Sequence, residues 1–138
     1  MTSARTLASG AVASVLAALV LTLAATVGAQ TAKPNYLPYA EFAAEDAPQA
    51  VGLKRAYNET VQRYNQSLYD YHVTLEKHDL LVDAHNRSTD TAERKKAREE
   101  AEALRARLAA LRRDVTTRAA AVDEAARRAV TAGITLPR

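Results

Sequence analysis

The three histidines of the chain, His72, His78 and His85, are the side chains best suited to chemistry, because imidazole binds metals and changes charge near neutral pH. On a helix, the last two would lie about 10.5 Å apart along the axis, too far to share one ion unless an oligomer brought copies together. The sequence therefore predicts no metal site and no cofactor. Protonation of His78 and His85 is instead expected to loosen the packing of a helix pair.

No catalytic constellation accompanies these residues. The chain has no cysteine and four glycines, so thiolate nucleophiles are absent and a phosphate-binding loop has little material. Serine, histidine and aspartate occur without a nucleophile elbow or paired carboxylates in an apolar setting. The net charge is only +3, and acids alternate with the basic residues of the C-terminal half, as on a solvated ion-pair face. We therefore expect neither an enzyme nor a nucleic-acid-binding protein.

Ring side chains recur at every seventh position from Tyr57 to His85, which is the spacing of a coiled-coil seam. Apolar residues recur with the same period, starting from Val61 at heptad position a. The first helix is expected at about 48–86, opening where Asp46 precedes Pro48. Its predicted seam consists of Tyr57, Val61, Tyr64, Leu68, Tyr71, Leu75, His78 and Val82.

A second helix is expected at about 91–132, after the polar cluster HNRSTD. Asp90 and Glu93 form an acidic capping box before it, and Gly133 is a typical residue after a helix end. Its predicted seam consists of Leu104, Leu108, Leu111, Val115 and Val122. The heptad register breaks between the two helices, which favours an antiparallel hairpin over the alternative of one continuous bent helix. A turn near Ser88 would place Tyr57 opposite residues 119–121.

The N-terminal residues predict export. Residues 1–29 contain Arg5, an apolar run and the sequence Val27-Gly28-Ala29, which together resemble a secretory signal peptide cleaved after Ala29. An uncleaved membrane anchor is the alternative. Residues 30–47 contain Pro34 and Pro38 and should form an extended lead-in, which either packs on the helices or docks a partner. Residues 134–138 form a short tail.

The predicted fold class is all-α: an antiparallel coiled-coil hairpin behind a signal peptide. A two-helix hairpin buries one stripe per helix, so self-association into a bundle is expected, aided by Tyr69, Val73, Leu80 and Leu81. The predicted function is an exported, non-catalytic structural or adaptor protein of the bacterial cell envelope, periplasmic or secreted. Its expected partner is itself or another coiled-coil protein, with membrane contact only if the leader is retained.

Two alternatives to this function remain. One is an ATP-independent periplasmic holdase, because the chain is similar in gross design to the helical-armed periplasmic chaperones: exported, basic and built from long helical hairpins. The other is a coiled-coil component of an envelope complex that stays anchored in the inner membrane through residues 7–27.

Overall fold

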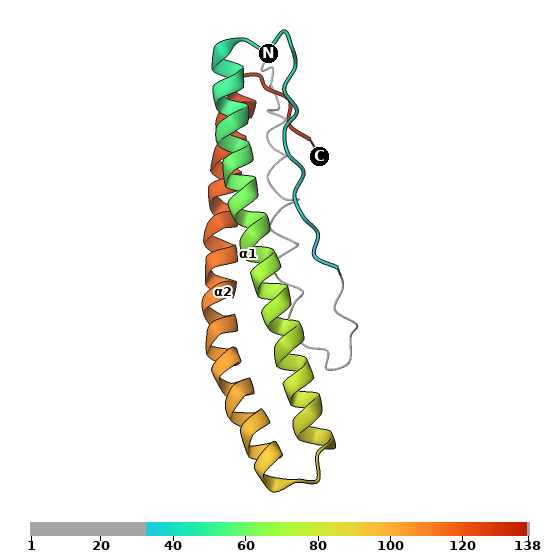
Figure 1. The fold of residues 1–138 in the computed structure, drawn as a ribbon. Coiled ribbons are helices and arrows are strands. Elements are labelled where there is room, and N and C mark those ends of the chain that lie inside the picture. The colour runs from blue at the N-terminus through green and yellow to red at the C-terminus, as the bar shows by residue number, and fades with distance from the viewer. Residues whose placement is uncertain (1–32, 138) are drawn as a thin grey trace, which may run out of the picture. The chain divides into compact units, whose positions relative to one another are not determined.

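The computed structural model describes residues 33–137. Two long helices, α1 (Pro48–Arg87) and α2 (Thr91–Thr131), pack against each other as a hairpin (Figure 1). Within residues 33–137 there is no strand. The predicted all-α class and the packing of two separate helices are confirmed. The predicted signal peptide lies outside the described residues.

The beginnings of the two helices are stabilised in different ways. Pro48 occupies the first turn of α1, and the capping residue before it, Ala47, offers no side-chain hydrogen bond. Asp46, which the sequence places at this helix start, does not cap α1. At the start of α2 the predicted cap is present, because Asp90 Oδ1 accepts a hydrogen bond from the Glu93 N–H at 2.9 Å. The Ser88 hydroxyl also donates to Glu93 Oε2 at 2.8 Å, which ties the turn to α2.

The C-terminal end of α2 turns the chain back over the hairpin. Gly133 has a φ of 80°, a value that glycine adopts without a steric penalty. Its N–H donates to the Val130 carbonyl at 2.9 Å, and the Ile134 N–H donates to the Ala129 carbonyl at 3.0 Å. This pair of bonds is a Schellman motif. It directs Leu136 onto the hydrophobic core.

Residues 33–46, here called the strap, run alongside α1 in the opposite direction and end in a turn at 44–45 that leads into the helix (Figure 1). Every third residue is covered: Pro34 and Leu37 are half-buried and Ala40 is buried. A period of three is that of the polyproline II helix, which the two strap prolines favour. The same period leaves a row of rings, Tyr36, Tyr39 and Phe42, exposed to solvent.

The hydrophobic core lies at the open end of the hairpin, where strap, α1, α2 and tail meet. It comprises Ala40, Tyr57, Val61 and Val122, with partly buried apolar residues packed around them: Leu37, Tyr64, Ala125, Ala126 and Leu136. The core thus groups Tyr57 with Val122 and residues beyond it, further along α2 than the expected 119–121. The turn occupies residues 88–90, so its middle lies one residue after Ser88 and the facing positions on α2 move in the same direction.

Candidate interaction surfaces

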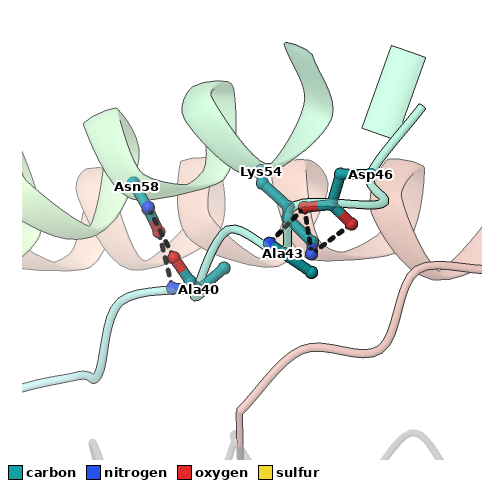
Figure 2. Close-up of polar contacts among 5 residues, drawn as sticks. All are labelled: Ala40, Ala43, Asp46, Lys54 and Asn58. Atoms are coloured by element: carbon teal, nitrogen blue, oxygen red, sulfur yellow. Dashed lines mark hydrogen bonds and ion pairs between the residues drawn. The ribbon is translucent and has the colours of Figure 1, made fainter. Parts of the chain in front are cut away.

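Two asparagines of α1 bind the main chain of the strap. Asn58 accepts from the Ala40 N–H at 2.7 Å and donates to the Ala40 carbonyl at 2.9 Å (Figure 2). Asn65 makes the same two bonds to Leu37, both at 2.9 Å. Each amide therefore satisfies both polar groups of one extended residue, as a neighbouring strand would. These contacts select an extended backbone and impose no choice of side chain.

An ion pair between the buried Lys54 and the half-buried Asp46 holds the strap where it joins α1. Lys54 Nζ lies 2.6 and 2.8 Å from the two carboxylate oxygens of Asp46, which also accepts a hydrogen bond from the Ala43 N–H at 2.9 Å (Figure 2). The hydrogen bond from Lys54, followed by that from Ala43, holds the pKa of Asp46 below its usual value. Lys54 lies one heptad before Val61, at the same heptad position a, and Asp46 neutralises its charge there.

The exposed rings of the strap border a groove on the surface of α1. This groove is shallow, has a volume of about 510 Å³ and combines apolar, amide and charged side chains. Its lining consists of Tyr39, Phe42, Val51, Arg55, Asn58, Glu59 and Gln62. Aromatic rings that are left half-exposed beside such a groove are typical of contact surfaces.

A polar contact crosses the interface between the two helices. The buried Ser67 hydroxyl donates to Asp114 Oδ2 at 2.5 Å, and the same oxygen accepts from Arg118 Nε at 2.8 Å. The hydrogen bond from Arg118, followed by that from Ser67, lowers the pKa of Asp114. Because these groups must meet to be satisfied, the contact fixes how α1 and α2 are aligned along their axes.

The predicted seam residues differ in their burial. Tyr57, Val61 and Val122 are buried, whereas Val82 near the turn is exposed. The others are half-buried: Tyr64, Leu68, Tyr71, Leu75, His78, Leu104, Leu108, Leu111 and Val115. Ser67 and Thr74, each just before an a position, are more buried than the leucines that follow them. Burial raises the phenol pKa values of Tyr57 and Tyr64.

The histidines lie toward the turn and are not brought together around one point. His78 and His85 line a groove of about 190 Å³ with Val82, Arg98, Ala101, Glu102 and Arg105. Their Nδ1 atoms lie 3.2 Å from Asp79 Oδ1 and 2.9 Å from the Arg94 carbonyl, respectively. Burial lowers the pKa of His72, against the opposing charge of Glu76. Among residues 33–137 no group of three or more histidine or acidic side chains is placed to hold a metal.

Tyr69, Val73 and Leu80 form an exposed apolar row on α1, here called the outer stripe. Their exposed fractions are 52, 46 and 70%, respectively. At 100° per residue they lie within about 40° of one another and opposite Ser67 and Thr74, which face α2. The outer stripe is therefore part of a helix face that neither α2 nor the strap covers, and the exposed Glu76 lies on the same face between Val73 and Leu80.

The exposed surface of α2 is charged, and part of that charge is paired within the helix. Ion pairs one helical turn apart join Arg98 to Glu102 at 3.0 Å and Arg128 to Glu124 at 3.0 Å. The hydrogen bond from Arg128, together with the charges of Arg127 and Arg128, lowers the pKa of Glu124. Such pairs are the solvated face that the alternating charges predict, and each stabilises the helix only slightly.

Neither helix within residues 33–137 combines the length and the apolar character needed to cross a bilayer.

Comparison with protein-family models, with curated proteins and with solved structures gives no match to this chain.

Proposed function

We propose that the protein is a non-catalytic structural or adaptor protein of the bacterial cell envelope that acts through coiled-coil association of helices. The outer stripe carries this proposal. Tyr69, Val73 and Leu80 present three large apolar side chains on one side of a helix of 40 residues. Their spacing of four and seven residues is the one with which a partner helix packs. Covering them removes apolar surface from water, which is the main driving force of such association.

The location of this activity depends on the leader. Cleavage of a signal peptide after Ala29 would release the hairpin into the periplasm or outside the cell. If the leader is not cleaved, residues 7–27 would anchor the hairpin in the inner membrane. The intact mass of the protein from soluble and from membrane fractions distinguishes the two. A soluble species beginning at Gln30 supports export and cleavage. A membrane-bound species beginning at Met1 supports the anchored form.

Photo-crosslinking in the native cell tests the helix-docking proposal. A benzophenone amino acid at position 69 or 80 should give a crosslinked species of higher mass, because the outer stripe is covered in the working assembly. The same amino acid at Glu100, an exposed position of α2, serves as the matched control and should give little product. Equal yields from all three positions, or no product at 69 and 80, would contradict docking through the outer stripe.

The strap rings favour a second candidate, an ATP-independent holdase for unfolded chains. Tyr36, Tyr39 and Phe42 offer exposed aromatic surface beside an open groove, and such surface binds apolar client segments of varied sequence. Suppression of the aggregation of a heat-denatured client at near-stoichiometric ratio tests this candidate. A Tyr39→Ser and Phe42→Ser variant should lose protection, while Leu80→Ser retains it. Absence of protection by the wild-type protein would remove the candidate.

A further inference from the structure

We propose that the outer stripe binds the outer stripe of a second copy of this chain, in an antiparallel contact between the two α1 helices that is centred on Val73. Two ion pairs flank the contact: Asp70 with the partner subunit's Lys77, and Lys77 with the partner subunit's Asp70. This inference rests on the proposed function and names the partner of its docking surface.

The charges beside the outer stripe have no ion pair within one described hairpin. Asp70 and Lys77 border the stripe one heptad apart, and neither appears in any salt bridge among residues 33–137. No basic residue lies three or four positions from Asp70, and no acidic residue lies three or four positions from Lys77. Within the helix they therefore cannot form the pairs that are common on α2.

The two charges are placed so that an antiparallel contact pairs both at once. Asp70 lies three residues before Val73 and Lys77 four residues after it, on the same side of the stripe. A two-fold axis at Val73 brings Asp70 opposite the partner subunit's Lys77, and Lys77 opposite the partner subunit's Asp70. The two resulting ion pairs are about 10.5 Å apart, one on either side of the axis. Val73 then meets the partner subunit's Val73, Leu80 lies level with the partner subunit's Gln66, and Tyr69 lies level with the aliphatic stem of the partner subunit's Lys77.

The same pattern disfavours a parallel contact. In a parallel two-fold pair, one flank of the stripe lies against the opposite flank of the partner, so Asp70 and Lys77 would not meet and neither ion pair would form. Flanking charges select helix orientation in this way. The apolar stripe supplies the attraction, and the charges supply the direction. A two-fold contact of one patch with itself is the usual form of a homodimer.

This contact leaves the interior of the hairpin unchanged. It uses neither the helix interface around Ser67 nor the strap bonds of Asn58 and Asn65, so these contacts can stay as they are when two copies meet. Association should therefore be reversible and dependent on concentration. Salt should weaken the two ion pairs more than the apolar attraction, because exposed ion pairs are screened. The difference in association between wild type and charge variants should therefore decrease at high salt.

Charge reversal of the full-length protein, purified as the cell processes it, tests the proposal by sedimentation equilibrium. The Asp70→Lys variant and the Lys77→Asp variant should each self-associate about tenfold or more weakly than wild type, because two ion pairs become two repulsions. The double variant should regain wild-type association. A mixture of the two single variants should form a heterodimer, because opposite charges then face each other again.

Glu100→Lys and Lys96→Asp, at exposed positions of α2, are matched controls that change the same charges and should leave association unaltered. Circular dichroism verifies that every variant is folded. Single variants that associate like wild type, or a mixture that does not, would overturn the antiparallel contact. A wild-type protein that stays monomeric while Leu80 crosslinks to a different protein overturns self-association and leaves the adaptor function standing. Monomer without any crosslink overturns both.

Discussion

Asn58 and Asn65 use both polar atoms of one side-chain amide on a single residue of the strap. A sequence signal for these contacts exists, because both asparagines follow a ring at the heptad period and a proline-containing segment precedes the helix. The repeat alone indicates a rod with a polar flank. Which backbone the amides bind depends on how the strap folds back, and heptad spacing carries no information on that.

We expect Asn65→Ala to release one residue of the strap and to leave the other bound. Two hydrogen bonds are lost and the Leu37 backbone is left to water, so the stability should fall by about 1–2 kcal/mol. Amide exchange measured by NMR should show faster exchange at Leu37, while Ala40 stays protected by Asn58.

Asn86→Ala is the matched control for this substitution. It occupies the same heptad position at the end of α1, is exposed and makes no side-chain hydrogen bond within residues 33–137. Loss of protection at Leu37 in the Asn86 variant, or unchanged protection in the Asn65 variant, would show that the amide does not hold the strap.

The pair of Lys54 and Asp46 makes the attachment of the strap dependent on acid. The pKa of Asp46 is lower in the folded than in the unfolded protein, so its contribution to stability is complete above the unfolded value of about 3.9. That contribution is lost as the pH falls through the folded value. The sequence places Asp46 beside the helix start, and α1 does begin at Pro48, but the sequence does not show that Lys54 reaches back to Asp46.

The pH dependence is measured by comparing wild type with Asp46→Asn. The variant should melt at a lower temperature at neutral pH, and the difference should shrink as the pH falls below about 3.9, because the folded wild type progressively loses the charge of Asp46. Acidic groups elsewhere titrate in both proteins and cancel in the comparison. Glu45→Gln, at an exposed neighbour, should show no such convergence. A difference that persists unchanged at low pH would contradict the ion pair.

At the scale of the elements, the sequence predicts where the two helices lie better than how they align. Heptads, a capping box and a terminal glycine are local patterns, and they predict helices close to those observed at 48–87 and 91–131. Alignment depends on contacts between residues far apart in the chain. In the sequence, Asp114 is indistinguishable from the other surface charges of an arginine-rich helix. Its contact with Ser67 is visible only in the folded structure.

A double-mutant cycle measures how strongly this contact aligns the helices. Ser67→Ala and Asp114→Ala should be coupled by about 0.5–3 kcal/mol, because each removes the partner of the other. Thr74 provides the control: it lies one heptad later and is equally buried, but its hydroxyl donates to the Asp70 carbonyl of its own helix. A cycle of Thr74→Ala with Asp114→Ala should show little coupling. Equal coupling in both cycles would contradict a specific contact.

At the scale of the hairpin, burial is distributed unevenly. Strap and tail cover the open end around Val61 and Val122, whereas Leu80 and Val82 near the turn are exposed. The sequence predicts a seam of even quality along α1, because its heptads continue to His85. It could not indicate the imbalance, because the covering segments lie outside the repeat.

Hydrogen exchange should reveal this imbalance as a gradient of local stability. We expect amides near Val61 and Val122 to exchange at least about tenfold more slowly than those near Val82 and Lys96, because regions with little buried apolar surface open first. Mass spectrometry of deuterated peptides measures this directly. Uniform protection along both helices, or the greatest protection beside the turn, would contradict it.

The agreement between strap and α1 sets a rule for how this architecture can change length. Seven helical residues advance about 10.5 Å, and three residues of polyproline II advance about 9.3 Å, so the spacing of Leu37 and Ala40 nearly matches that of Asn65 and Asn58. A longer version would therefore grow by insertions of seven residues in each helix together with three in the strap. Insertions of other sizes would leave the amides facing the wrong strap residues, so natural length variants should differ in these units.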